Sequence, residues 1–148
     1  MQQAVDQQVA HGHHVTLLTA VGRDAVGDAV VGELHAAGVD TSQLFRLDGA
    51  TTRSLVLVDP QGERTVVNVA RCEQAEPPQR LLTLAADAVY VRSRRLDLAP
   101  LLARKAEEAL VVAHVPPLDP GSRPAQVLVA SASDLDRELT RDPLALGR

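Results

Sequence analysis

The 148-residue chain is 45% hydrophobic, which is enough apolar material for one domain with a buried core. Its only aromatic residues are Phe45 and Tyr90, its only lysine is Lys105, and its formal net charge is -4. This composition offers neither a basic surface for a phosphate backbone nor a set of aromatic rings for stacking on bases, so it disfavours nucleic-acid binding.

The chain shows no sign of membrane insertion or export. No apolar stretch approaches the ~20 residues that a membrane-spanning helix needs. The N-terminal residues are mainly Gln, Asp and His rather than a basic head followed by an apolar run. Cys72 is the single cysteine and has no partner for an internal disulfide, which suits a reducing compartment. We therefore expect a soluble, cytoplasmic protein with no membrane partner.

The first predicted elements are the end of a helix and a strand. Residues 2–11 place Val5 and Val9 one helical turn apart, and Gly12 follows as a helix stop. Residues 14–21, HVTLLTAV, have the length and β-branched content of a strand that is buried on both faces.

A second helix follows a glycine turn. Gly22 turns the chain, Asp24 is a candidate N-cap, and apolar residues recur at helical spacing as far as Gly38. A strand, turn and helix in this order predict a parallel strand as the next element.

Short strands dominate the following segment. Residues 44–47, 54–59 and 65–70 are β-rich runs, and residues 59–62, DPQG, form a turn signal between the last two. The last two runs therefore predict a β-hairpin. Its alternating Val56, Val58, Val66 and Val69 predict one apolar face.

The second half of the chain returns to alternating helices and strands. We expect helices over residues 77–85, 96–109 and 133–139, strands over 88–92, 110–115 and 126–130, and a loop over 116–121. The whole pattern is typical of one α/β domain that carries a β insertion.

Two motifs resemble those of the PfkB, or ribokinase-like, family of sugar and nucleoside kinases. Residues 22–27, GRDAVG, resemble the family's Gly-x-Asp-x-x-Gly turn, and residues 37–42, AGVDTS, match another family segment. Thr51 and Thr52 ahead of the hairpin, with GERT at residues 62–65, resemble the strands that form the family's lid over its substrate.

The resemblance implies a three-layer α/β fold, with a mainly parallel sheet, helices on both faces and a small β lid at about residues 43–70. Residues 1–148 then form a single partial domain, incomplete at both ends. The family's first strand and Gly-Gly loop are missing, and its C-terminal Gly-Ala-Gly-Asp motif does not occur in these residues. The motif contributes the anion hole and the catalytic base, so no catalytic residue is assigned.

The function implied by the resemblance is ATP-dependent, Mg²⁺-requiring phosphorylation of a hydroxyl on a sugar, a nucleoside or a related small molecule. Without the Gly-Ala-Gly-Asp motif, the chain alone is expected to be inactive. The alternative is a catalytically silent domain that acts only in ligand binding or subunit association. Pairing of two copies through the lid strands is also implied.

The resemblance also suggests site residues. It implies a substrate contact for Thr52 in the lid. Residues 131–134, SASD, resemble the family's Asn-x-x-Glu element with Ser for Asn and Asp for Glu, which implies a role for Ser131 and Asp134 near magnesium and nucleotide phosphate.

Other polar groups have two interpretations each. His11, His13 and His14 either form a metal site or simply precede a strand. No acidic or cysteine ligands accompany them, so we expect no metal site there. The run of Arg and Ser at residues 92–95 either binds an anionic group of the substrate or forms a solvated loop after a strand.

Overall fold

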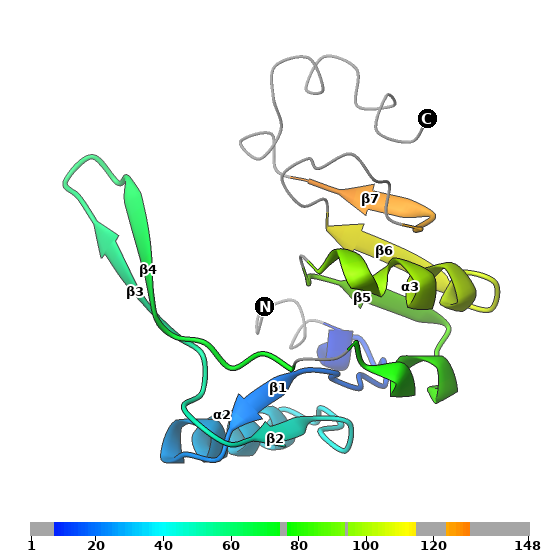
Figure 1. Cartoon of the computed structure of the whole chain (residues 1–148), viewed down its shortest axis with the longest axis horizontal. Helices are drawn as coiled ribbons and strands as arrows, with labels where there is room; N and C mark the ends of the chain where they lie inside the picture. Colours follow the sequence, from blue (N-terminus) through cyan, green and yellow to red (C-terminus); the bar gives the residue numbers. More distant parts are fainter. Residues whose placement is uncertain (1–7, 75–76, 94, 115–123, 131–148) are drawn as a thin grey trace. The chain divides into compact units, whose positions relative to one another are not determined.

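The computed structural model describes residues 8–74, 77–93, 95–114 and 124–130. The chain divides into two compact units, Met1–Glu76 and Pro77–Arg148, each of which contains parallel strands and helical segments (Figure 1). The expected single domain over residues 1–148 stays a prediction. No helix among the described residues has the length and hydropathy to cross a bilayer.

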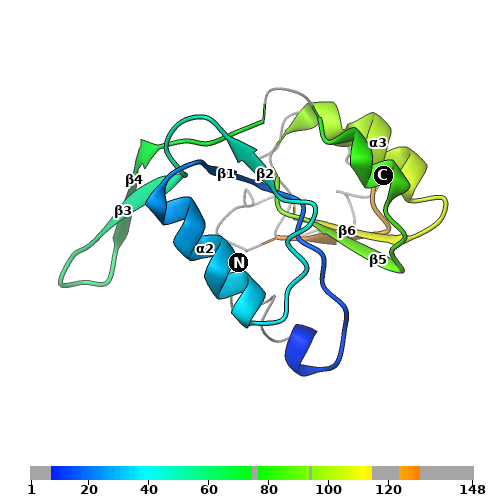
Figure 2. The ribbon, with the colours of Figure 1, turned by 90° about the horizontal axis from the view of Figure 1, so that it is seen from below.

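The first unit is built on a β-α-β crossover of strand β1 (Ala20–Gly22), helix α2 (Ala25–Ala36) and strand β2 (Phe45–Leu47). The two strands pair in parallel, and α2 lies against them (Figures 1 and 2). The predicted cap is confirmed, because the Asp24 side chain accepts a hydrogen bond from the Gly27 amide at 2.8 Å. The predicted stop is also confirmed, since Gly38 has a φ of 81°.

Two predictions about these strands are wrong. Residues 44–47, expected among the lid strands, instead contribute β2 to the parallel pair. The strand expected over residues 14–21 is limited to an isolated bridge between Thr16 and Asp40 and to β1. The ladder is interrupted because the opposite segment makes a turn, in which the Leu44 amide bonds the Thr41 carbonyl. Of the helix expected over residues 2–11, the described part is helical at residues 8–10.

The predicted hairpin is confirmed. Strands β3 (Arg53–Val58) and β4 (Arg64–Ala70) pair antiparallel in a sheet separate from β1 and β2. Their turn is held by Asp59, whose carboxylate oxygen accepts hydrogen bonds from the amides of Gln61 and Glu63, each at 2.9 Å. Every residue of both strands is exposed except the half-buried Ala70, so the ribbon stands off the parallel pair.

The second unit contains a three-stranded parallel sheet. Strands β5 (Ala88–Val91), β6 (Leu110–His114) and β7 (Val127–Val129) lie side by side in this order. All three strands were expected, and each is confirmed within one or two residues at its ends. The loop expected over residues 116–121 and the helix expected over residues 133–139 both lie outside the described residues.

The helices of this unit are shorter than the sequence predicts. Residues 77–85 form only the 3₁₀ helix η1 (Gln79–Thr83), in which the Leu81 amide bonds the Pro78 carbonyl at 2.9 Å. Residues 96–109 form a 3₁₀ helix, η2 (Leu96–Leu98), followed by helix α3 (Ala99–Lys105). Pro100 explains the break, because it has no amide to bond the Leu96 carbonyl and is tolerated only in the first turn of α3.

A buried lysine joins α3 to the segment after η1. Lys105 is 1% exposed, and its ammonium donates hydrogen bonds to the Leu84 carbonyl and to the Glu108 carboxylate, the latter at 2.7 Å. The apolar core around the sheet includes Leu102, Val111 and Ala113. The core of this unit is therefore built from Leu, Val and Ala side chains.

Candidate functional site

A polar joint connects the start of α2 with the start of the lid hairpin. The Asp24 carboxylate caps α2 and also accepts hydrogen bonds from the Thr51 hydroxyl and, at 3.1 Å, from the Thr51 amide. The Thr51 hydroxyl oxygen in turn accepts a hydrogen bond from the Gly22 amide at 3.0 Å. Thr51 is 4% exposed, so this network fixes the root of the hairpin against the end of β1.

The two glycines of the GRDAVG motif make the joint possible. A Cβ added to Gly22 would lie 2.3 Å from the Gly49 carbonyl oxygen, and one added to Gly27 would lie 2.2 Å from the Gly22 carbonyl oxygen. Both contacts are with backbone atoms, which cannot move aside as a flexible side chain can. The spacing of the motif is therefore a packing requirement at this joint.

The hydrogen bonds of the joint hold Asp24 in its charged form. The Thr51 hydroxyl, the Gly27 amide and the Thr51 amide together lower the pKa of Asp24 from 3.8 to about 2. The unfolded chain therefore binds the Asp24 proton more tightly than the folded chain. The stability that Asp24 contributes is complete above about pH 4 and is lost as the pH falls through about 2.

We expect the Asp24→Asn variant to be less sensitive to acid than the parent chain. Between about pH 4 and pH 2, the parent should lose stability in the first unit more steeply than the variant, because only the parent can protonate this carboxylate. Urea midpoints followed through the α2 amide signals measure the difference. Asp40 also has a lowered pKa, through Ser42, but it is present in both proteins and its effect cancels. Equal pH slopes would contradict the assigned role of Asp24.

Thr52, the residue expected to contact substrate, lies at the base of the hairpin. Its hydroxyl accepts a hydrogen bond from the Cys72 amide at 2.8 Å and donates to the Cys72 carbonyl at 3.4 Å. Consecutive threonines thus bind opposite sides of the hairpin root, Thr51 to α2 and Thr52 to the chain that leaves β4. Burial, and then the Asp24 charge, raise the pKa of the Cys72 thiol, so the thiol is not activated as a nucleophile.

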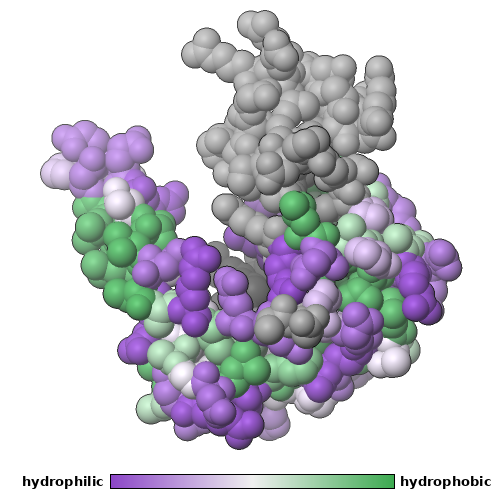
Figure 3. Space-filling model, viewed as in Figure 1, coloured by the Kyte–Doolittle hydropathy of each residue, from purple (hydrophilic) through white to green (hydrophobic). Residues whose placement is uncertain are grey.

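Apolar side chains cover the hairpin between its root and its polar turn (Figure 3). Val56 pairs directly with Val66, and the alternation of a strand places Val58 on the same face. Val69, expected on this face, has no opposite partner, because it is the extra residue between the Arg53–Ala70 and Ser54–Asn68 pairs. The opposite face carries Leu55, Leu57 and Val67, so both faces of the ribbon are apolar.

The remaining predicted site residues are not brought to this joint by the described structure. Ser131 and Asp134 lie outside the described residues. Within the described ranges, no three His, Cys, Asp or Glu side chains gather where they would hold a metal ion. In the arginine run, Arg95 forms an ion pair with Asp97.

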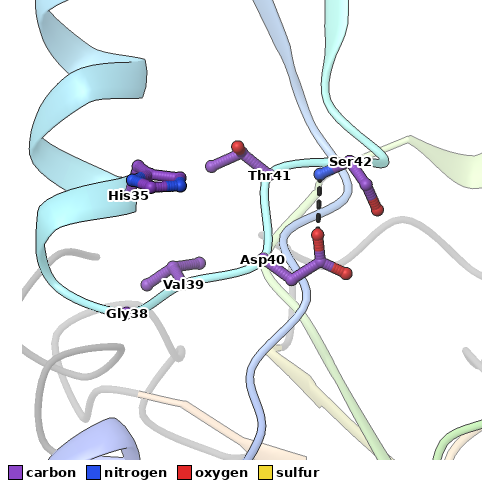
Figure 4. Close-up of a pocket in the computed structure, with 6 residues that line it drawn as sticks. All are labelled: His35, Gly38, Val39, Asp40, Thr41 and Ser42. Carbon is purple, nitrogen blue, oxygen red and sulfur yellow. Dashed lines mark hydrogen bonds between the residues drawn. The ribbon is translucent and has the colours of Figure 1, made fainter.

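A shallow hollow of about 570 Å³ lies at the C-terminal end of α2 (Figure 4). It is lined by residues of the helix end and of the AGVDTS motif, namely His35, Gly38, Val39, Asp40, Thr41 and Ser42. The Asp40 carboxylate is engaged by its own turn, where it accepts the Ser42 amide hydrogen bond at 2.8 Å. The rise of a 12-residue helix puts this hollow about 18 Å from the start of α2, so we assign it no part in the candidate site.

Sequence reasoning identified Asp24 as a cap and did not identify its second role. The bonds to Thr51 join residues that are 27 positions apart, and neither helical nor strand periodicity relates them. The glycine spacing of GRDAVG was the available signal, because paired glycines often mark a close approach of backbone.

Comparison with protein families matches residues 9–120 to the model described as pfkB family carbohydrate kinase. A comparison with curated protein sequences gives no significant match. Similar solved structures include a fructokinase from Xylella fastidiosa, at 21% identity and a TM-score of 0.65, with 96% of this chain and 51% of that chain covered. A ribokinase from Giardia lamblia is 16% identical with a TM-score of 0.69, covering 95% and 52% of the two chains. A 2-dehydro-3-deoxygluconokinase from Thermotoga maritima is 17% identical with a TM-score of 0.68, and the match covers 88% of this chain and 49% of that chain.

The chain therefore spans about half the length of these solved structures. At such identities the likeness shows the fold, which is ribokinase-like α/β with a β lid, as the sequence predicted. The family match covers the crossover, the Asp24–Thr51 joint, the hairpin and the strands up to β6. Because this match extends over most of the chain, the chain belongs to the pfkB family of carbohydrate kinases.

Proposed function

We propose that the chain is part of an ATP-dependent kinase that transfers the γ-phosphate to a hydroxyl of a sugar or a related small molecule. The observation that carries this proposal is the family match over residues 9–120, which includes a lid hairpin rooted by a polar joint. The solved relatives are named as kinases of small carbohydrates. ATP use and the single cysteine favour a cytoplasmic location.

In this proposal the hairpin covers the bound sugar. Closing a lid excludes water from the transferring phosphoryl group, and such closure needs a hairpin with a fixed root. The bonds of Thr51 to Asp24 and of Thr52 to Cys72 provide that root. We propose that Thr52 also contacts a hydroxyl of the sugar. We propose that Ser131 and Asp134 orient Mg²⁺ and nucleotide phosphate. Bound Mg²⁺ would neutralise charge on the phosphates during transfer.

A second candidate function is a catalytically silent domain that binds a ligand or associates with another subunit. The apolar ribbon favours this candidate, because its side chains remain between 45% and 69% exposed on both faces. In either case we propose that two copies pair through their lid strands. Such pairing removes apolar surface from water and satisfies the open strand edges.

We expect the 148-residue chain by itself to show no sugar-dependent ATP hydrolysis or phosphoryl transfer. The sequence contains no Gly-Ala-Gly-Asp, and the missing anion hole and base would supply most of the stabilisation of the transition state. A coupled ADP assay with Mg²⁺ across pentoses, hexoses and nucleosides measures this. Turnover above buffer with any of them would contradict the expectation.

The genomic DNA on both sides of the coding segment separates the two candidate functions. An in-frame or frameshifted Gly-Ala-Gly-Asp downstream would favour the kinase, and the extended polypeptide should then phosphorylate a member of the same panel. An extended polypeptide with the motif and without turnover would favour the silent domain.

A further inference from the structure

A basic pair lies at the carboxyl edge of the sheet in the second unit. Val91, the last residue of β5, is in register with Ala113 of β6. The next residue of each strand segment is therefore Arg92 on one side and His114 on the other. Ligands of open parallel sheets bind at the carboxyl ends of the strands, so these two side chains belong to the edge where a substrate is expected.

Among the described residues, this edge carries an arginine without an ion-pair partner. Asp97 lies five residues beyond Arg92, and its charge is already matched, because Arg95 donates two hydrogen bonds to its carboxylate. Arg92 is exposed and forms no ion pair with the described residues. Its guanidinium is therefore a cation at the end of β5 that no described carboxylate pairs with.

Ser93 adds a hydrogen-bond donor beside this cation. Its hydroxyl oxygen accepts the Arg95 amide hydrogen bond at 3.3 Å, which orients the side chain and leaves the hydroxyl proton available to donate. A planar guanidinium, a hydroxyl and an imidazole together suit an oxyanion, since arginine binds carboxylate and phosphate through two parallel hydrogen bonds.

We propose that Arg92, Ser93 and His114 bind an anionic group, a carboxylate or a phosphate, that the acceptor sugar carries before phosphorylation. The proposed kinase then acts on a sugar acid or a sugar phosphate in preference to a neutral sugar. This inference rests on the proposed function for the nature of the ligand and on the register of β5 and β6 for its location.

The test compares three related probes with the 148-residue chain at constant ionic strength: D-glucose, D-gluconate and D-glucose 6-phosphate. Titrations followed by calorimetry and by amide chemical shifts give affinity and location. We expect at least one anionic probe to bind about tenfold more tightly than glucose and to shift the amide signals of Ser93 and His114. The tighter anion identifies carboxylate or phosphate as the group that is recognised.

Arg92→Gln should remove this tenfold preference for the anionic probe over glucose. Arg104→Gln, at an exposed position in the last turn of α3, makes the same change in charge and should keep the preference. Equal binding of neutral and anionic probes would overturn the inference and leave sugar binding intact. A preference that survives Arg92→Gln, or no binding of any anionic probe, would also overturn it. Failure of the kinase proposal is detected separately, by the turnover of the extended polypeptide.

Discussion

Alanine at Gly22 or at Gly27 is expected to destabilise the first unit by about 3 kcal/mol. In each case the new Cβ would lie within 2.3 Å of a carbonyl oxygen of the backbone, so the joint between β1, α2 and the hairpin root must open. Opening the joint also weakens the hydrogen bonds from Gly22 and Thr51. Both effects act in the same direction.

The matched control is Gly32→Ala in the same helix. A Cβ at Gly32 meets no atom within 4 Å, and alanine is the better helix former, so this variant should gain about 0.5–1 kcal/mol. Urea unfolding with amide exchange of α2 reports on the first unit specifically. If Gly32→Ala lost as much stability as Gly22→Ala, or if Gly22→Ala and Gly27→Ala lost none, the glycine spacing would have another cause.

The second large effect is expected in self-association. We expect the chain to associate through the hairpin, and we expect the double variant Val56→Lys and Val66→Lys to be monomeric at concentrations where the parent chain associates. The two residues are direct cross-strand partners, so two like charges would meet on one face of the ribbon and oppose its burial.

Sedimentation velocity over a concentration series measures this association. The control is the double variant Gln79→Lys and Ala103→Lys, which adds lysines at exposed positions of the second unit and should associate like the parent. A parent chain that stays monomeric with a cooperative thermal transition would show that the hairpin surface does not pair. Association that persists in the Val56 and Val66 variant would place the interface elsewhere.

The sequence was sufficient for features set by local chemistry. Asp24 before an apolar helical pattern, Gly38 at its end and the Asp59 turn between two β-branched runs each depend on neighbours within a few residues. Such signals do not require a tertiary partner, and the structure confirms all three. The family motifs likewise predicted the ribokinase-like fold.

Pairing between distant segments was decided only by the tertiary structure. Residues 44–47 are a β-rich run that suits either a lid strand or a parallel strand, and the crossover geometry of α2 assigned them to β1. The hydrogen bonds between Asp24 and Thr51 depend on the close approach of two backbone segments. The neighbouring positions of Arg92 and His114 depend on the register of β5 and β6. Periodicity predicts which residues form an element, whereas these contacts depend on how close two elements come, which is a property of the packed fold.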